Sequence, residues 1–235
     1  MLEGDRGEAD LCFVRGEFYL FVSCAVETPE PIDVDGALGV DLGLVNVATD
    51  SDGEQYSGTH VVSLRERRHR QRKRLQAKGT KSARRVLKRL SGRETRFMTN
   101  VNHTISKQLV QKAQCTGRAL ALEELSGIRD RVKVRRTQRR KLHSWAFRQL
   151  GQFVQYKAAL AGVPVVFIDP AYTSQTCSAC GHDSRSNRPS QDTFLCVQCS
   201  FSANADVNAA VNISELARPV LGWAACNSAV QLAPS

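Results

Sequence analysis

The chain has 235 residues, of which 42% are hydrophobic, and a formal net charge of +10. This length is sufficient for one main domain with a sizeable core and a small additional module. No apolar run approaches the roughly 20 residues that a membrane-spanning helix requires, and no apolar signal segment opens the sequence. We therefore expect a soluble, cytoplasmic protein rather than a membrane or secreted one.

The positive charge is concentrated in two segments. Residues 65–96 hold 15 of the 33 lysines and arginines, and residues 129–148 hold nine more, against three acidic residues in the two segments together. Their net charge is +21, whereas the rest of the chain, with nine basic and 20 acidic residues, carries −11. The first segment predicts a helix with charge on every side, because it has little apolar stripe to pack against a core.

Nucleic acid is the partner that such basic segments usually bind, with an affinity that depends strongly on salt. A solvated helix without a partner is the alternative, although like charges four residues apart oppose the helix unless a partner neutralises them. The second segment predicts a loop or helix end that orders on binding. The residues expected to contact nucleic acid here are Arg65, Arg67, Arg68, Arg70, Arg72, Lys73, Arg74, Arg135, Arg136, Arg139 and Arg140.

Alternating apolar residues and turn residues predict strands in the first quarter of the chain. The first two should form a hairpin, followed by a connector rich in proline over residues 29–36. Turn signals at Gly43 and at residues 51–53 favour antiparallel pairing of the strands after the connector. The expected strands span residues 10–14, 18–26, 37–41, 44–49 and 54–63.

Helices dominate the rest of the chain. After the basic helix, which should end near Gly79, apolar spacings of three or four residues predict helices separated by two short apolar strands. The expected helices span 82–91, 98–113, 144–161 and 206–213, and the expected strands 119–122 and 163–169. This order of elements is that of an RNase H-like domain, so the predicted fold class is α/β, with a mixed sheet, helices and an inserted zinc ribbon.

Four cysteines predict that zinc ribbon. Cys177-x2-Cys180 and Cys196-x2-Cys199 are separated by 15 residues, and each two-residue gap lets both thiolates of a tight turn face one tetrahedral ion. His182 follows the first pair, but four cysteines already complete the tetrahedron. Two disulfides in a secreted domain are the alternative.

The other cysteines lie singly in the sequence. Cys12, Cys24, Cys115 and Cys226 do not pair by spacing, and we expect them to be reduced and mostly buried thiols. The tail over residues 217–235 has no charged residue after Arg218, and we expect it to be peripheral.

Three carboxylates lie at the ends of predicted elements. Asp41 ends the strand Leu38-Gly39-Val40-Asp41, where alternation turns it to the face opposite Val40; Glu123 ends another apolar strand; Asp206 begins the last helix. Each alone is typical of a turn or a cap. If the elements converge, the three can hold a pair of divalent cations such as Mg²⁺ or Mn²⁺, which act in two-metal hydrolysis of nucleic acid.

The motifs that contain these residues closely resemble the TnpB/OrfB family of transposon-encoded, RNA-guided nucleases, which are related to the miniature type V CRISPR effectors. The resemblance spans about residues 10–215, and four motifs carry it: Gly39-Val-Asp-Leu-Gly-Leu44, Leu122-Glu-Glu-Leu-Ser126, Tyr172-Thr-Ser-Gln-Thr-Cys-Ser-Ala-Cys-Gly-His182 and Asp206-Val-Asn-Ala-Ala-Val-Asn-Ile213. It implies that Asp41, Glu123 and Asp206 are the RuvC-like catalytic acids, with Glu123 rather than Glu124 in this role. It further implies that the four cysteines bind zinc in a target-nucleic-acid-binding module.

The resemblance also implies a division of the chain. Family members carry a long wedge and recognition region before the nuclease, so we expect a truncated member, a fragmentary reading frame or one half of a split system. The expected parts are a wedge hairpin and connector (1–36), a RuvC-like core with a basic helical insertion (37–173), the zinc ribbon (174–204), the last RuvC helix (205–215) and a tail (216–235).

The main hypothesis is a transposase-associated, metal-dependent DNA endonuclease that binds DNA and a guide RNA. Tyr172, Thr173 and Ser174, directly before the first cysteine pair, are further residues expected to touch nucleic acid. The alternative from another class is a remnant that binds or represses nucleic acid without cutting it. A guide-independent nuclease that recognises branched DNA is a third possibility.

Overall fold

The computed structural model describes residues 6–14, 16–43, 46–57, 59–124, 146–169 and 171–226. Its centre is a mixed sheet in the order β5-β4-β3-β6-β7. Strands β3 (Ala37–Asp41), β4 (Asn46–Asp50) and β5 (Gln55–Ser57) pair antiparallel, whereas β6 (Ala119–Glu123) and β7 (Val165–Ile168) continue from β3 in parallel. The predicted mixed α/β architecture is therefore confirmed.

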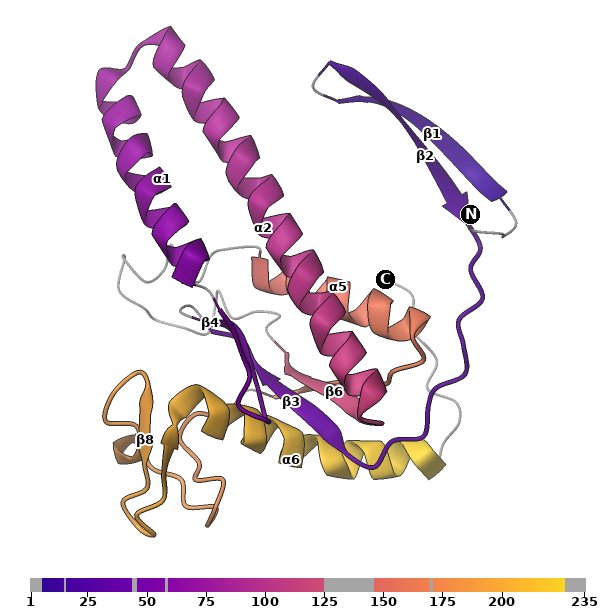
Figure 1. Cartoon of the computed structure of the whole chain (residues 1–235), viewed down its shortest axis with the longest axis vertical. Coiled ribbons are helices and arrows are strands. Elements are labelled where there is room, and N and C mark those ends of the chain that lie inside the picture. The colour runs from indigo at the N-terminus through magenta and orange to yellow at the C-terminus, as the bar shows by residue number, and fades with distance from the viewer. Residues whose placement is uncertain are drawn as a thin grey trace.

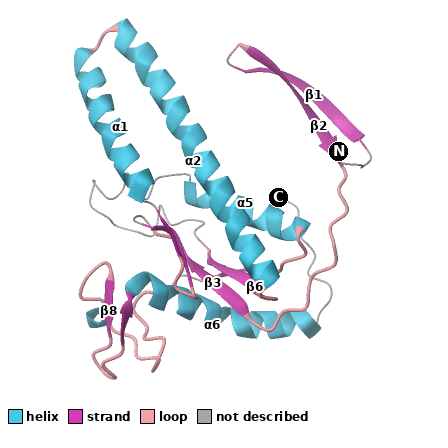
Figure 2. Ribbon diagram, viewed as in Figure 1, coloured by secondary structure: helices cyan, strands magenta, loops and turns pink. Residues whose placement is uncertain are grey.

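Helices cover both faces of the sheet (Figure 1). One face packs against α2 (Lys81–Cys115) and α5 (Ala146–Leu160), which also contact each other. The other face packs against α6 (Ala205–Cys226). Figure 2 shows the sheet between these layers, with α6 along its length.

The two faces of β3 and β6 differ in side-chain size. The large side chains are fully buried in the cluster with α2 and α5: Leu38, Val40, Leu120 and Leu122. The small residues that alternate with them face α6: Ala37, Gly39, Ala119 and Ala121. A Cβ at Gly39 would lie 2.0 Å from the Ala210 carbonyl oxygen, so only glycine lets α6 approach this closely. The alternation places Asp41 and Glu123, the next residues in each series, on the side of α6.

Two long antiparallel helices extend beyond the sheet (Figure 1). Helix α1 (Thr59–Lys78) ends at Gly79, which has a φ of +65°, and Thr80 caps α2 by accepting a hydrogen bond from the Ala83 amide at 3.2 Å. The turn at Gly79 was predicted correctly. The two separate helices predicted over 82–113 are instead the continuous helix α2, because Leu90 and Met98 extend its buried face across the supposed gap.

Strands β1 (Arg6–Val14) and β2 (Glu17–Cys24) form the predicted hairpin, which stands apart from the sheet at the end of an extended connector (Figure 1). Its apolar side chains are exposed; Phe18 is 72% and Leu11 68% accessible. The expectation of mostly buried single cysteines is wrong here. Cys24 is exposed and Cys12 half-buried, because nothing among the described residues packs on the hairpin, and Cys115 is exposed at the end of α2.

Two predicted boundaries were wrong. The strand predicted over 54–63 ends at Ser57, and α1 begins at Thr59. The last helix does not stop near residue 213 but runs to Cys226, because Ile213, Ala217 and Leu221 continue an apolar face against the sheet. Pro219 lies within this helix rather than in a peripheral tail. No helix in the described ranges is both long and apolar enough to cross a bilayer.

Candidate metal and nucleic-acid site

The three predicted acids lie together at the carboxyl ends of β3 and β6. Asp41 and Glu123 are the last residues of the parallel neighbours β3 and β6, and Asp206 lies in the first turn of α6, which crosses β3. All three side chains are partly buried. The alternation that turned Asp41 away from Val40 is confirmed, and it is the reason that the strand acids share a face with Asp206.

The electrostatics show that the acids interact. Burial, followed by the charges of Glu123 and Asp206, raises the pKa of Asp41 to about 7, although Arg188 opposes the shift. Burial also raises the pKa of Glu123 and that of Asp206. The charges of Glu123 and Asp206 therefore act on Asp41, and carboxylates are the ligands that hard divalent cations prefer.

The loop before the zinc ribbon holds Glu123 in place. The Thr173 hydroxyl donates a hydrogen bond of 2.6 Å to Glu123 Oε1, which favours the carboxylate form and lowers its pKa against the effect of burial. Asn212 of α6 in turn donates to the Thr173 carbonyl at 2.8 Å. Thr173, which the sequence predicts to touch nucleic acid, is 3% exposed, and its hydroxyl contacts Glu123.

The residues on either side of Thr173 are more accessible. Tyr172 is 63% exposed and has a φ of +66°, a conformation that L residues rarely adopt, and Ser174 is half-buried. The Tyr172 carbonyl accepts hydrogen bonds from the amides of Gln175 and Thr176, which holds this tight turn. Tyr172 therefore presents its ring to solvent beside the acids.

Arg188 is a residue of the site that the sequence did not reveal. It belongs to the ribbon, and its guanidinium lies 3.4 Å from Asp206 Oδ1 while donating to the Gln191 carbonyl at 2.9 Å. It lies outside both basic segments, in the loop between the two cysteine pairs. The ribbon fold alone brings it to the acids, so no local pattern could have identified it; the same loop also carries Arg185, Asp183 and Asp192, and nothing in the sequence distinguishes Arg188 from them.

The four predicted zinc ligands form a compact cluster. Their sulfur atoms all lie within 4.8 Å of one another; the Cys177–Cys199 distance is 3.7 Å and the Cys180–Cys196 distance 3.6 Å. A tetrahedral zinc with Zn–S bonds of about 2.3 Å places its sulfurs about 3.8 Å apart, so the cluster fits the ion. Backbone amides of Cys199 and Gln198 directed at the sulfur lower the pKa of Cys196 to about 6, which favours the thiolate ligand. His182 does not belong to the cluster.

Buried asparagines connect the ribbon to the acids. Asn187 donates to the carbonyls of Gln175 and His182 and accepts from the Val197 amide, which joins both cysteine turns. Asn208 of α6 donates to the Thr176 carbonyl at 2.9 Å and accepts from the Ser178 amide at 3.0 Å. Because Asn208 lies two residues after Asp206, the position of the ribbon and that of the acid depend on each other.

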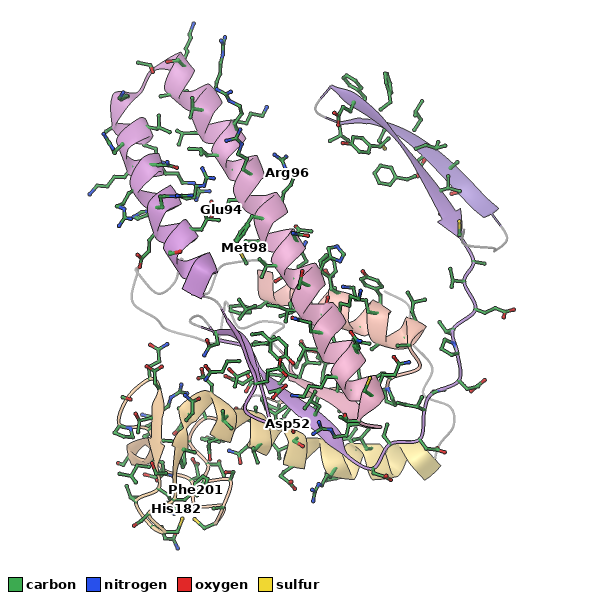
Figure 3. All side chains as sticks on the ribbon, viewed as in Figure 1. Asp52, Glu94, Arg96, Met98, His182 and Phe201 are labelled. Carbon is green, nitrogen blue, oxygen red and sulfur yellow. The ribbon has the colours of Figure 1, made fainter. Side chains whose placement is uncertain are left out.

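The predicted basic contacts lie on α1, away from the acids. Arg67, Arg70, Lys73 and Arg74 are exposed, whereas Arg72 forms an ion pair with Glu94 of α2 and Arg68 donates to Gln71. Figure 3 shows Glu94 on the side of α2 that faces α1 and many basic side chains projecting outward from both helices. Arg65 lies within α1, and Arg135, Arg136, Arg139 and Arg140 lie outside the described residues.

Two family models match parts of the chain. Residues 21–129 match the family model OrfB_IS605, described as probable transposase, and residues 147–213 match the Cas12f1-like TNB domain. A CRISPR-associated endodeoxyribonuclease Cas12f2 of a Micrarchaeota archaeon is 32% identical over 86% of the chain and 40% of that protein. The putative RNA-guided DNA endonuclease InsQ of Escherichia coli is 25% identical over 92% of the chain and 57% of that protein.

A solved structure shares the fold. The Cas12f1 chain in a cryo-EM structure of a Cas12f1-sgRNA-target DNA complex aligns with a TM-score of 0.58 and 18% identity, over 88% of this chain and 55% of that one. The chain thus spans about two fifths to three fifths of the length of these proteins. The two matched family regions, the relatives and the shared fold confirm the predicted resemblance: the chain belongs to the TnpB/OrfB family, which has Cas12f proteins among its relatives.

Proposed function

We propose that the chain is a transposase-associated, divalent-cation-dependent DNA endonuclease of the RuvC type. The observation that carries the proposal is the convergence of Asp41, Glu123 and Asp206 at the ends of β3, β6 and α6, with the pKa of Asp41 raised to about 7 by burial and its acidic neighbours. The names of the relatives, Cas12f2 endodeoxyribonuclease and putative RNA-guided DNA endonuclease, support the same activity.

The proposal includes an RNase H-like core over residues 37–173, the zinc ribbon over 174–204 and the nuclease helix that follows. Three antiparallel strands followed by two parallel ones, in the order β5-β4-β3-β6-β7, support this division. The four cysteines would hold a structural zinc, and the extra turns of α6 would belong to the core rather than to a tail.

In this proposal the three acids hold Mg²⁺ or Mn²⁺, most simply as a pair. Such ions supply Lewis-acid stabilisation of the phosphodiester and a lowered pKa of the attacking water. Thr173 holds Glu123 as an oriented carboxylate. Arg188 keeps Asp206 in position and offers a guanidinium, which suits phosphate oxygens, at the same edge.

The proposed partners are DNA and a guide RNA. The complex that contains the Cas12f1 neighbour holds both, and the exposed arginines of α1 offer phosphate contacts on this chain. Tyr172 and Ser174 beside the acids are proposed to touch the DNA strand, Tyr172 by stacking.

Cleavage of labelled single-stranded DNA by the zinc-loaded full chain, with and without Mg²⁺ or Mn²⁺, tests this function. We expect metal-dependent cutting that falls at least about 10³-fold, or about 4 kcal/mol, in Asp41→Ala. Asp169→Asn is the matched control, because this carboxylate follows β7 at the same edge but is exposed and caps the Ala171 amide.

Two results would contradict the proposal. Cutting that survives Asp41→Ala would place the chemistry elsewhere. Salt-sensitive binding by the wild type without any cutting, on single-stranded and branched DNA and with guide RNA added, would favour a nucleic-acid-binding protein instead.

A further inference from the structure

A cavity lies beside the acid cluster and shares one of its walls. It has a volume of about 270 Å³ and opens between the ends of β6 and β7 and the first turns of α5. Glu123 at the end of β6 belongs both to its lining and to the acid cluster, so the cavity adjoins the proposed site of phosphodiester cleavage. Its volume lies just under the range of about 300–1,000 Å³ typical of small-molecule pockets, which suits one flat group rather than a larger ligand.

The lining combines aromatic rings with hydrogen-bonding groups. Phe147 from α5 and Phe167 from β7 contribute the rings, and Phe167 keeps 38% of its surface exposed although it lies within a strand. Gln152 and Gln155 lie one turn apart on α5. They add two exposed amides that have no hydrogen-bond partner among the described residues. Aromatic faces with free donors and acceptors beside them are the chemistry that binds a nucleobase.

We propose that this cavity binds one nucleobase of the DNA strand, next to the phosphodiester held at the acids. The inference rests on the proposed nuclease function. A base is joined to its phosphate by a single sugar, so a phosphodiester at Glu123 brings a flanking base to a cavity that Glu123 itself lines. Phe147 or Phe167 stacks on the base, and the amides of Gln152 and Gln155 meet its polar edge.

Gly151 keeps the cavity open. A Cβ at this position would meet only Phe167 Cε1, at 3.9 Å, so the space above the residue is empty rather than filled by packing. Gly151 lies in the interior of α5, where glycine is less favourable than alanine. Replacing it with leucine therefore fills the cavity without removing any wall, and Gly151→Ala is the matched control with little added volume.

The experiment measures binding of single-stranded hexanucleotides to the zinc-loaded full chain in Ca²⁺. Each oligonucleotide carries 2-aminopurine, whose fluorescence is quenched by stacking, or an abasic site at one position in turn. We expect wild type to quench one or two positions strongly. An abasic site there should weaken binding by about 5- to 100-fold, the range of one base stack.

In Gly151→Leu the quench and the sensitivity to the abasic site should both disappear, while Gly151→Ala keeps them. Phe147→Leu, which removes a ring but keeps an apolar side chain, provides a second test should Gly151→Leu not fold. Retention of position-specific quenching in both the leucine variants, or uniform quenching by wild type, would overturn the proposal. Since neither signal requires cutting, absence of cleavage would count against the nuclease function while a position-specific, Gly151-dependent quench would still establish the cavity as a base site.

Discussion

Asn208 links the cysteine cluster to the acid cluster, yet the two clusters are built differently. The four sulfur atoms are gathered within 4.8 Å of one another, whereas the three carboxylates, which come from two strands and a helix, do not form so tight a group. The first arrangement closes completely around one ion. Under the proposed function the second would leave a cation accessible to water or a phosphate oxygen, so we propose a structural role for the first site and a chemical role for the second.

Removal of zinc should have the largest effect, and it should unfold the ribbon while leaving the sheet that carries Asp41 and Glu123 folded. Structural zinc contributes apparent binding free energies of about 10–16 kcal/mol in small zinc domains, so chelator or Cys177→Ser should unfold the ribbon. Hydrogen exchange should then show loss of amide protection over residues 174–204, with the strands β3 and β6 still protected. Cys115→Ser, an exposed cysteine outside the cluster, is the control and should change nothing. Unchanged ribbon protection in chelator would contradict the zinc assignment.

Loss of the hydroxyl of Thr173 should weaken the acid cluster without unfolding it. Hydrogen bonds to charged groups contribute about 1.5–3 kcal/mol, so Thr173→Val should slow cleavage by about 10- to 100-fold. Without the donor, the pKa of Glu123 should rise further, so the acid limb of the pH–rate profile should move to higher pH. Thr173→Ser should restore both rate and profile. A slower rate with an unmoved profile would mean that Thr173 only supports the loop.

The pH dependence of stability tests the acid cluster without its metal. Because the folded-state pKa of Asp41 is about 7 and its ordinary value is 3.8, the folded metal-free chain binds the proton between these values and the unfolded chain does not. This contribution to stability is present at low pH and is lost as pH rises from about 4 to 7, with a slope of up to about 1.4 kcal/mol per pH unit.

Thermal unfolding of the metal-free acid site from pH 5 to pH 8, with zinc retained, measures this contribution. Asp41→Asn should gain stability relative to wild type as pH rises. Mg²⁺ should restore the stability of wild type but not change that of Asp41→Asn. A difference between the two proteins that does not vary with pH would show that burial and the acidic neighbours do not raise the pKa of Asp41.

The smallest predicted effect concerns α1, which lies away from both clusters. Arg70→Ala with Lys73→Ala should weaken nucleic-acid binding similarly for all sequences and reduce the slope of log affinity against log salt by about 1.4–1.8. Lys107→Ala, an exposed lysine of α2 beyond the basic segment, is the control. An unchanged slope in the double variant would mean that α1 is a solvated helix.

The two clusters also differ in how far the sequence predicts them. The spacing of the cysteines in the sequence predicts that they form one cluster, so this site could be derived from local sequence alone. Asp41 and Glu123 could be placed on one face by alternation, but their meeting with Asp206 depends on Gly39, whose missing side chain lets α6 lie against β3. Arg188 and Thr173 reach the acids only through the ribbon and its loop, which no local pattern encodes.

The errors in the predicted fold also come from tertiary contacts that local sequence does not encode. The continuous α2 and the length of α6 follow from apolar faces that pack on the sheet, and such tertiary contacts extend helices past the points where local signals weaken. The exposed cysteines were predicted to be buried because apolar neighbours in sequence suggested a core, whereas the hairpin has no partner among the described residues.

The central claim is that Asp41, Glu123 and Asp206 together hold an exchangeable divalent cation, and Mn²⁺ binding measures it most directly. Electron paramagnetic resonance of Mn²⁺ titrated into the zinc-loaded full chain at pH 8 should show bound ion in wild type and in Asp169→Asn, and its loss in Asp41→Asn, Glu123→Gln and Asp206→Asn. Equal binding by wild type and the three acid variants would contradict the account.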